Sequence, residues 1–443
     1  MNTSRLIVAG FLLVSVFACN LPAGAPASPV AEPSTAEPAS PIAPSGAATT
    51  APAPAVPPPP DHRIAVRLVD GVGEFYDRLS GDKFVPQGMN YVRIGPQTAP
   101  DGSAQTYHST FDPGKYDGAA VEAALERMHA DGYNVVRVFV SQNTIGTADD
   151  GLSQPYMQNM ADFLAHAKQN QIYVMITQDW LPGGRYGRLI NEGCCDQFDF
   201  NNAQNLPPSA VEAYEVYYAD FITGLLNLKA PTDAIFSYEL RNEYFFDTDY
   251  PPFTLDSGTV TTANGKTYDM SSAADKQKMA EENLPHFIDQ VRASILQLDP
   301  TALVSVGFFQ PQTPNPTRIG DARLVVTAPA IWNSQADFID LHVYPDAGLS
   351  LQQYVQNFGL NGMEAKPIIM GEFGGAAANL ASLDSAAHVF ATWQKESCAY
   401  GFDGWLFWTW DTAEQPDFLN ALQGNGQIEK ALAPINRPDP CGN

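Results

Sequence analysis

Eight short apolar segments alternate along this chain with stretches that have the apolar spacing of helices, and this alternation most constrains the fold. The segments occupy residues 84–91, 133–140, 172–177, 234–243, 303–308, 338–343, 367–372 and 404–410. Most are continuously apolar, which is typical of strands covered on both faces. Strands that alternate with helices pair in parallel, so eight such units predict an α/β fold, a closed (β/α)8 TIM barrel. An open doubly wound sheet is the alternative, but no Gly-x-Gly-x-x-Gly motif follows the first strand.

The predicted barrel has one element before it and one insertion within it. Residues 64–85 alternate in polarity around an Asp70-Gly71 turn, which predicts a short β-hairpin. Residues 244–274 are rich in aromatic residues, proline and glycine, and we expect them to wall one side of a cleft. Helices are expected at 116–130, 156–169, 209–228, 275–298, 349–358, 383–395 and 427–432. One domain, 62–443, would contain all of these elements.

The first sixty residues do not have the composition of a folded domain. Arg5 precedes an apolar run at 6–17 that is too short to span a bilayer, and Cys19 follows a small residue just after it. This pattern resembles the bacterial lipoprotein signal, in which the cysteine is lipidated; a plain signal peptide with an incidental cysteine is the alternative. Residues 20–61 are mostly Pro, Ala, Ser and Thr and predict a disordered linker. We expect residues 1–19 to be a signal peptide and the protein to be extracytoplasmic, either anchored to the membrane at Cys19 or secreted.

Charge and cysteine content narrow the possible partners. The formal net charge of −25, from 24 basic and 49 acidic residues, argues against a nucleic acid and suits a neutral ligand. Besides Cys19 there are four cysteines, which allow three disulfide pairings. Pairing Cys398 with Cys441 would tie the C-terminal tail to the last long helix and leave Cys194 beside Cys195. No nearby histidine completes a zinc site, so we expect no metal, and we expect no cofactor. We also expect the protein to be a monomer.

The predicted strands end in residues that suggest a site. Functional residues of a (β/α)8 barrel lie at the carboxyl ends of its strands. Two of these ends carry glutamates, Glu243 and Glu372, and cleavage of a glycosidic bond requires two carboxyl groups. Tryptophan and tyrosine stack on sugar faces, whereas Asn, His and Arg hydrogen-bond sugar hydroxyls. The other polar and aromatic residues at strand ends are Asn90, Tyr91, Arg137, Asp179, Trp180, Asn242, His342, Tyr344, Trp408 and Trp410.

Six short motifs, taken in order, resemble those of the clan A glycoside hydrolases, and family 5, with its cellulases and β-mannanases, is the most similar. The motifs occupy residues 88–91, 134–137, 242–243, 342–344, 371–374 and 405–408. The resemblance covers about residues 62–435 and implies that 62–443 is the catalytic domain. It further implies a retaining β-glycoside hydrolase that acts by double displacement, with endo action on a β-1,4-linked polysaccharide such as mannan or cellulose/β-glucan. A non-catalytic glycan-binding lipoprotein and an exo-acting β-glycosidase are the alternatives.

The resemblance also implies roles for single residues. Glu243 matches the acid/base and Glu372 the nucleophile, which Arg137 and Tyr344 would hold and polarise. Asn242 would hydrogen-bond the sugar 2-hydroxyl, and Trp408 would be the stacking platform. The remaining candidates for substrate binding are Asn90, Tyr91, Asp179, Trp180 and His342. We expect burial against aromatic residues and the charge of Glu372 to favour the protonated form of Glu243.

Two positions depart from the family pattern. Family 5 enzymes often carry a histidine after the third strand, where Asp179 stands here, and a proline after the acid/base, where Tyr244 stands. We expect these changes to affect substrate preference and not the chemistry. Glu239, Arg241 and Glu243 occupy alternate positions and so lie on one face of the predicted strand. We expect Glu239 and Arg241 to form a buried ion pair, either structural or supporting the site. His108 lies in a loop after the first strand and could reach the cleft.

Overall fold

The computed structural model describes residues 60–99, 102–147, 151–193, 196–309, 311, 319–344 and 349–442. The chain divides into residues 1–54 and a compact unit formed by residues 55–443. The predicted signal peptide, Cys19, nearly all of the predicted linker, Cys194 and Cys195 lie outside the described residues. The account below concerns the compact unit.

The central sheet is parallel and closes on itself. Its strand order is β12–β8–β7–β6–β3–β17–β16–β15–β13. β12 (Val304–Ser305) and β13 (Gly307–Phe309) are two halves of one segment, the first paired with β8 and the second with β15. The sheet therefore begins and ends on the same segment, which makes the eight-unit barrel that the sequence predicts. The other strands are β3 (Gln87–Asn90), β6 (Val135–Val140), β7 (Tyr173–Gln178), β8 (Ile235–Glu239), β15 (Ile339–His342), β16 (Ile368–Phe373) and β17 (Phe402–Phe407).

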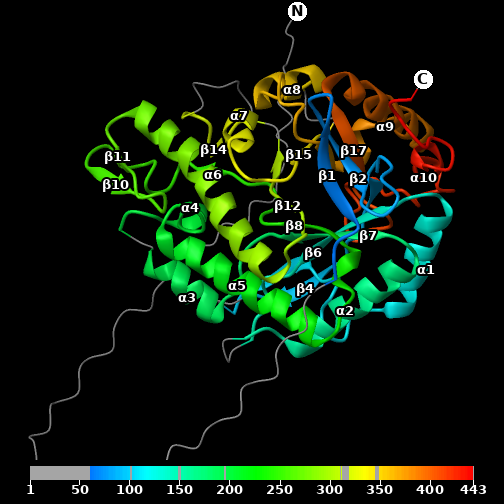
Figure 1. Cartoon of the computed structure of the whole chain (residues 1–443), viewed down its shortest axis with the longest axis horizontal. Coiled ribbons are helices and arrows are strands. Elements are labelled where there is room, and N and C mark those ends of the chain that lie inside the picture. The colour runs from blue at the N-terminus through cyan, green and yellow to red at the C-terminus, as the bar shows by residue number, and fades with distance from the viewer. Residues whose placement is uncertain are drawn as a thin grey trace, which may run out of the picture. The chain divides into compact units, whose positions relative to one another are not determined.

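Helices cover the outside of the barrel (Figure 1). They are α1 (Gly118–Ala130), α2 (Gln154–Gln169), α3 (Gly184–Glu192), α4 (Phe200–Ala203), α5 (Pro208–Asn227), α6 (Ala273–Leu298), α7 (Ala328–Trp332), α8 (Leu351–Phe358), α9 (Leu383–Ser397) and α10 (Gln427–Leu432). The predicted helices are confirmed, whereas α3, α4 and α7 were not expected. Several start at side-chain caps: Asp117, Ser272 and Ser382 each accept a hydrogen bond from a backbone N–H three residues later. Among the described helices, none has the length and hydrophobicity needed to cross a membrane.

The predicted N-terminal hairpin, β1 (Ile64–Val69) and β2 (Val72–Asp77), covers the amino end of the barrel. The ring of Phe75 packs on Phe236 near the start of β8 and on Phe338 just before β15, with ring centroids 5.3 Å apart in both contacts. These residues belong to a core cluster that also includes residues near the starts of several other barrel strands. Because the hairpin covers this end, the carboxyl ends of the strands are the end available to a ligand.

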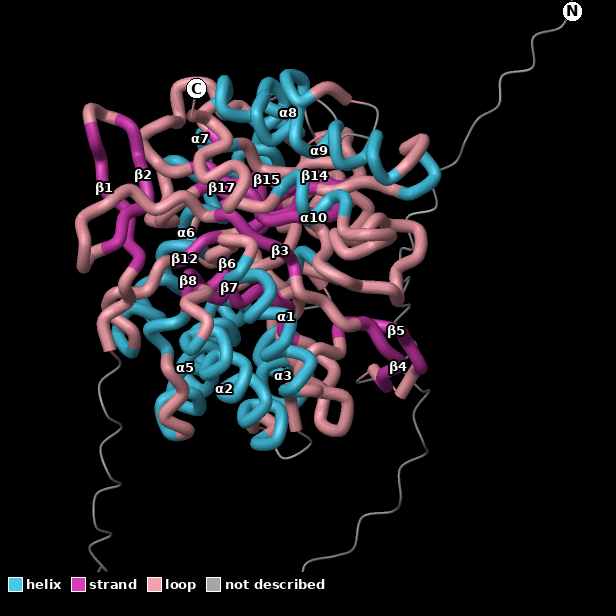
Figure 2. Tube along the Cα trace, turned by 90° about the vertical axis from the view of Figure 1, so that its right-hand side faces the viewer, coloured by secondary structure: helices cyan, strands magenta, loops and turns pink. Residues whose placement is uncertain are grey.

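Several short strands lie outside the barrel sheet. A second hairpin, β4 (Ile94–Thr98) and β5 (Ala104–His108), replaces the loop expected after the first barrel strand and lies across the molecule from β1–β2 (Figure 2). Asp-Gly at 101–102 is the hairpin signal in this part of the sequence. The 244–274 insertion holds β9 (Phe246–Asp247), β10 (Thr259–Thr261) and β11 (Thr267–Asp269). β9 pairs with β14 (Arg323–Leu324), which links the insertion to the segment before β15.

Two further features bear on the sequence predictions. Cys398, directly after α9, forms a disulfide with Cys441 and so ties down the C-terminal tail, which was one of the possible pairings.

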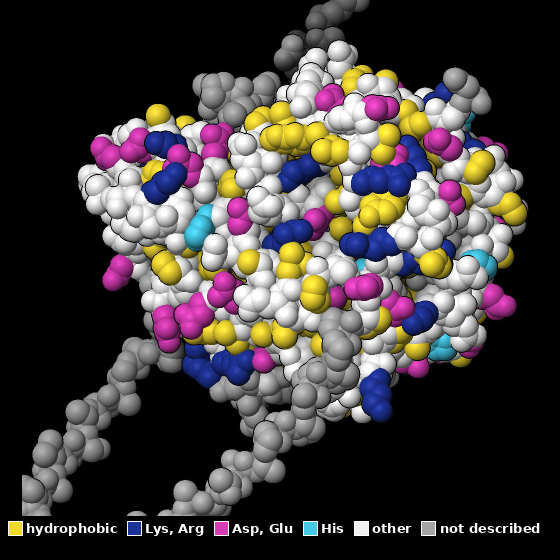
Figure 3. All heavy atoms as spheres, viewed as in Figure 1, with side chains coloured by type: hydrophobic (Ala, Val, Ile, Leu, Met, Phe, Trp, Pro, Cys, Tyr) yellow, Lys and Arg dark blue, Asp and Glu magenta, His cyan; other side chains and the backbone are white. Residues whose placement is uncertain are grey.

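On the face shown in Figure 3, Lys and Arg side chains are interspersed with acidic and hydrophobic ones. Mixed charge of this kind differs from the continuous basic patch of a nucleic-acid-binding face.

Candidate active site

Arg137 of β6 lies at the centre of a buried polar cluster at the carboxyl end of the barrel. Its side chain is fully buried. Its Nη1 donates to Glu372 Oε1 at 2.6 Å and to Asn90 Oδ1 at 3.0 Å. Its Nε donates to Glu239 Oε2 and its Nη2 to Asn242 Oδ1, both at 2.8 Å. One rigid guanidinium thus fixes residues from β3, β8, β16 and the segment after β8 in a single arrangement.

Glu372 of β16 is held at both carboxylate oxygens. Arg137 donates to Oε1, and the hydroxyl of Tyr344 donates to Oε2 at 2.6 Å. Tyr344 is itself placed by Tyr354 of α8, whose hydroxyl donates to the Tyr344 carbonyl at 2.7 Å. Both oxygens of Glu372 therefore accept hydrogen bonds, which fixes the orientation of the carboxyl group.

Glu243 does not lie on a strand, although the sequence predicted that the strand would extend to it. β8 ends at Glu239, and the following segment stays attached to the sheet through hydrogen bonds from Asn242 N to Gln178 O and from Tyr244 N to Gly307 O. Glu243 has a φ of 42°, in the left-handed region that non-glycine residues rarely adopt. This turn of the backbone brings one carboxylate oxygen of Glu243 within 4.8 Å of one of Glu372.

Two cationic side chains face the two oxygens of Glu243. Oε1 lies 3.4 Å from Nδ1 of His342, and Oε2 lies 3.9 Å from Nη2 of Arg323. Burial raises the pKa of Glu243, but His342, Arg323 and Arg137 outweigh burial, so its pKa is lowered from the ordinary value. The sign is opposite to our expectation, which considered burial and Glu372 but not these cations.

His342, at the end of β15, is fully buried and carries that positive charge. Burial lowers its pKa, but the charge of Glu372 and the interactions with Asp340 and Glu243 outweigh burial and raise the pKa to about 10. Its Nδ1 also lies 3.6 Å from Glu372 Oε2. The imidazole is therefore placed against both glutamates at once.

Arg323 is a site residue that the sequence analysis missed. Its guanidinium lies 3.8 Å from the ring centroid of Phe309 and 4.3 Å from that of Phe245. It reaches Glu243 only because β14 pairs with β9 of the insertion, with Arg323 opposite Asp247. No local motif marks an arginine in such a position.

Trp408 directly follows β17 and borders the surroundings of Glu372. It packs edge-to-face on Phe139 of β6 with ring centroids 5.7 Å apart, and its Nε1 donates to Gln415 Oε1 at 3.2 Å. Tyr344, the donor to Glu372, packs against the cluster that Trp408 forms with Phe139 and Val92. Trp408 is therefore linked to the surroundings of Glu372 through Tyr344, and its role as a stacking platform stays a prediction.

Asp179 and Trp180 lie together after β7, next to the β4–β5 hairpin. The hydroxyl of Tyr107 in β5 donates to Asp179 Oδ2. Burial raises the pKa of Asp179 to about 6, against the opposing charge of Arg241. The guanidinium of Arg241 lies 4.3 Å from the ring centroid of Trp180.

The expected pairing of Glu239 with Arg241 is wrong. Glu239 pairs with Arg137, and Arg241 donates from Nη2 to Asn201 Oδ1 at 2.6 Å. Every second residue of a strand lies on the same face, which predicts that Glu239 and Arg241 are neighbours on one face. The strand ends at Glu239, so this rule does not apply to Arg241.

Two aromatic candidates lie farther from the carboxylates. Tyr91 packs on Phe163 of α2, in the layer between sheet and helices, and the structure does not bring it to the two glutamates. His108 stacks on Phe139 with ring centroids 4.1 Å apart. Burial, followed by the charge of Arg137, lowers the pKa of His108 to about 3, so the ring is neutral.

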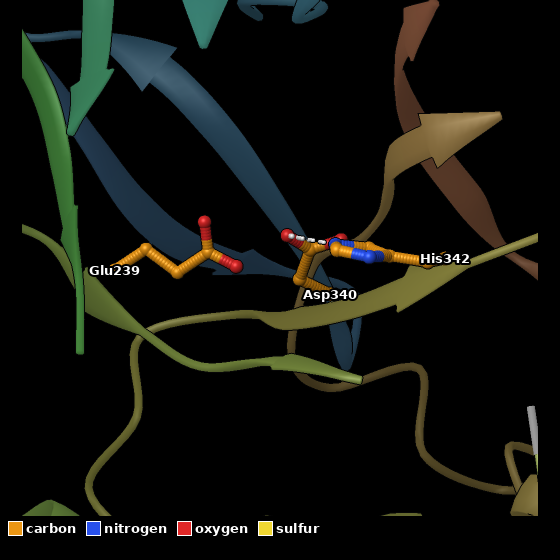
Figure 4. Close-up of side chains that lie close together, drawn as sticks. All are labelled: Glu239, Asp340 and His342. Carbon is orange, nitrogen blue, oxygen red and sulfur yellow. Dashed lines mark ion pairs between the residues drawn. The ribbon is translucent and has the colours of Figure 1, made fainter. Parts of the chain in front are cut away.

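Two groups of described side chains bring oxygen and nitrogen ligand atoms within 4.8 Å of one another. One consists of Glu243, His342 and Glu372, and the other of Glu239, Asp340 and His342 (Figure 4). Such donors could hold a cation. Arg137 already supplies a buried positive charge to one carboxylate of each group, Glu372 and Glu239.

Comparison with known proteins identifies a matching family. The family model described as cellulase (glycosyl hydrolase family 5) matches residues 98–414. No curated protein matches the chain.

Solved structures of similar fold include enzymes that act on different glycans. The endo-1,4-beta-D-mannanase of Thermotoga petrophila RKU-1 has a TM-score of 0.51 and 16% identity, over 80% of this chain and 100% of that one. The endocellulase of Pyrococcus horikoshii has a TM-score of 0.50 and 13% identity, over 85% of this chain and 98% of that one. The exo-beta-1,4-mannosidase Op5Man5 of Opitutaceae bacterium strain TAV5 has a TM-score of 0.49 and 18% identity, over 82% of this chain but only 58% of that one. The first two likenesses confirm the barrel fold.

Proposed function

Since the chain belongs to glycosyl hydrolase family 5 and is therefore a β-glycoside hydrolase, we propose that it cleaves its substrate by double displacement with Glu372 as nucleophile and Glu243 as acid/base. The observation that carries this proposal is the spacing of the two glutamates. One oxygen of each lies within 4.8 Å of the other. Retaining glycosidases place their carboxyl groups about 5–5.5 Å apart, whereas inverting ones need roughly 6.5–9.5 Å to admit a water.

In the first step, Glu372 attacks the anomeric carbon and Glu243 protonates the departing oxygen. Arg137 and Tyr344 hold the two oxygens of Glu372, so the attacking carboxylate needs no reorientation. The bond to the leaving group breaks as the bond from Glu372 to the sugar forms. The charge of Glu372 disappears in the resulting ester, and the negative charge passes to Glu243.

In the second step, Glu243 takes a proton from water as the water oxygen bonds to the anomeric carbon, and the bond from that carbon to Glu372 breaks and frees the carboxylate. His342 and Arg323 stabilise its ionised form, as the lowered pKa of Glu243 indicates. The first step requires protonated Glu243. The same cations reduce the fraction of Glu243 that is protonated at neutral pH. We therefore propose an acidic pH optimum.

As substrate we propose a β-1,4-linked polysaccharide, mannan or cellulose/β-glucan, cleaved internally. Mannose and glucose differ in configuration at the 2-hydroxyl. Asn242 is the candidate to contact it: its Oδ1 accepts from Arg137, which leaves its Nδ2 as a donor for a ligand. Trp408 would support the sugar ring at the point of cleavage.

The test is hydrolysis of a panel of purified β-glycans, with the configuration of the first product followed by proton NMR. We expect retention, and a product of inverted configuration would overturn the double displacement. Glu372→Ala should abolish hydrolysis and leave glycan binding intact, and undiminished hydrolysis would remove Glu372 from its role. A ladder of oligosaccharides would support endo action, whereas release of one sugar at a time would favour the exo alternative.

We also propose that the protein is a monomer and lies outside the cytoplasm, anchored through lipid at Cys19. The support is the lipoprotein-like pattern around Cys19 and the Cys398–Cys441 disulfide, since disulfides persist in oxidising compartments. Incorporation of labelled fatty acid by the wild type but not by Cys19→Ser tests the anchor. Equal labelling of both would count against it.

A further inference from the structure

Three buried polar atoms on β8 and β15 lie close together, next to the two candidate catalytic glutamates. They are Oε1 of Glu239, Oδ2 of Asp340 and Nε2 of His342, and their side chains point toward one another (Figure 4). All three side chains are fully buried. None of the three atoms makes a hydrogen bond to another described residue. Buried polar groups without hydrogen bonds are costly, so such a concentration calls for an explanation.

Two glycines make room for this cluster. A Cβ at Gly371 would lie 2.2 Å from Asp340 Oδ2, and one at Gly307 would lie 2.1 Å from Glu239 Oε1 and 3.0 Å from His342 Nε2. No side chain larger than hydrogen fits at either position without displacing the polar residues. The cluster is therefore built into the packing of the strands.

Asp340 connects the cluster to the nucleophile strand. Its Oδ1 accepts a hydrogen bond of 2.6 Å from the backbone N–H of Gly371, the residue before Glu372. Its Oδ2 lies 3.8 Å from His342 Nε2, which is an ion-pair distance and too long for a hydrogen bond. One carboxylate thus holds both the backbone beside the nucleophile and the far side of the His342 ring.

The His342 ring has carboxylates at both of its nitrogens. Nδ1 faces Glu243 Oε1 at 3.4 Å and Glu372 Oε2 at 3.6 Å, and Nε2 faces Asp340. Either neutral tautomer would direct a lone pair at a carboxylate, whereas the imidazolium presents N–H on both sides. The charged form is therefore the one that matches its surroundings.

We propose that Asp340 is a positioning residue for the reaction: through His342 it holds a positive charge between the two catalytic glutamates. The inference rests on the proposed function of that pair. Asp340 touches neither the proposed position of the scissile bond nor the side chains of Glu243 and Glu372. It acts by keeping His342 protonated, so that His342 stabilises Glu243 once Glu243 has given up its proton.

The charge on His342 depends on all of its neighbours. The charged and titratable groups that face it or act on it are Glu239, Asp340, Glu243, Glu372 and, through the carboxylates, Arg137. Burial opposes the imidazolium, and the carboxylates outweigh burial to give a pKa of about 10. Removing the charge of Asp340 should lower this pKa toward the neutral range, because Asp340 is the carboxylate at Nε2.

Asp340→Asn tests the proposal, since the amide keeps the size of the side chain and an oxygen for the Gly371 N–H. With ¹⁵N-labelled histidine, NMR should show His342 protonated on both nitrogens from pH 5 to 8 in the wild type and titrating within that range in the variant. The kcat of the variant relative to the wild type, on the glycan that the wild type cleaves best, should fall about tenfold between pH 5.5 and 8. A structural defect would lower the ratio equally at every pH.

Asp299→Asn is a matched control at the other end of the barrel. Asp299 is also fully buried and pairs with a histidine, His62, at 2.8 Å. His62 Nδ1 contacts the carbonyl of Ile235 at the start of β8, far along the strand from the site. We expect this variant to lose stability while its kcat ratio to the wild type stays independent of pH.

Three results would overturn the inference. The first is a neutral His342 in the wild type at pH 7, which is decisive even if Asp340→Asn fails to fold. The second is a kcat ratio for Asp340→Asn that does not depend on pH. The third is a stoichiometric metal ion in the purified wild type that Asp340→Asn loses, because the cluster would then be a metal site. The NMR titration needs no substrate, so failure of the inference can be distinguished from failure of the proposed hydrolytic function.

Discussion

Arg323 places its guanidinium 3.9 Å from the carboxylate of Glu243, at the oxygen that does not face His342. Phe245 and Phe309 pack against the guanidinium and hold it there. The carboxylate of Glu243 therefore has a cation near each of its oxygens, and its protonation depends on both cations.

Arg323→Gln should shift the alkaline limb of the kcat/KM profile to higher pH. That limb reports loss of the proton from the acid, and removing a neighbouring cation raises the pKa of Glu243. We expect a shift of roughly half a unit to one unit. Arg323→Lys keeps the charge and should leave the limb close to that of the wild type. An unchanged limb in Arg323→Gln would show that Arg323 does not act on Glu243.

Tyr344→Phe should lower kcat/KM about tenfold to a hundredfold, because a hydrogen bond to a charged group contributes roughly 1.5–3 kcal/mol. The lost bond is the 2.6 Å contact from the Tyr344 hydroxyl to Glu372 Oε2. Tyr133→Phe is the matched control, since the hydroxyl of this buried tyrosine donates at 3.0 Å to the backbone carbonyl of Glu429 and not to Glu372. Steady-state kinetics of both variants would check this, and an equal loss in both would assign the effect to packing.

Asp179→Asn should change how stability depends on pH. The pKa of Asp179 is about 6 in the folded protein, raised mainly by burial, against an ordinary value near 3.9. Its contribution to stability is therefore fully present below about pH 4 and is lost as pH rises through about 6. The free energy of unfolding of Asp179→Asn, relative to the wild type, should increase across this window when measured by chemical denaturation. A difference that is constant with pH would contradict the raised pKa.

Reduction of the Cys398–Cys441 disulfide should destabilise the barrel. The bond closes a loop with a sequence separation of 43 residues. Chain-entropy arguments for a loop of that length give about 4 kcal/mol. Denaturation with and without reductant would measure the loss in the wild type. In the Cys398→Ser, Cys441→Ser double variant, reductant should have little further effect, and a large one would point to another bond.

Much of the fold could be predicted because its signals are local. The eight strands are apolar runs, and the hairpin 64–77 has its turn residues and alternating pattern in sequence. The strand that was predicted to reach Glu243 ends at Glu239. The predicted Glu239–Arg241 pair depended on that longer strand, and Glu239 pairs with Arg137 instead. The β4–β5 hairpin was missed because its polar strands lack an apolar run.

The residues of the candidate site also fall into those that local sequence predicts and those that it does not. Glu243, Glu372, Arg137 and Tyr344 could be named as candidates in advance because each lies in a short motif within or just after a predicted strand. Arg323 and Asp340 could not, since one depends on the pairing of β14 with β9 and the other on space left by Gly371. The direction of the Glu243 pKa shift was missed for the same reason, because it depends on those distant cations.

By itself, the sequence determined the order of strands and helices and the two glutamates, because apolar periodicity and short motifs depend on neighbours along the chain. Only the tertiary structure decided which charges meet. Arg137 joins Glu239 across a separation of 102 residues and Glu372 across 235. Closure of the barrel brings these groups into one buried site, where low solvent access makes their interactions strong. The electrostatic character of the catalytic pair is therefore a property of the closed barrel.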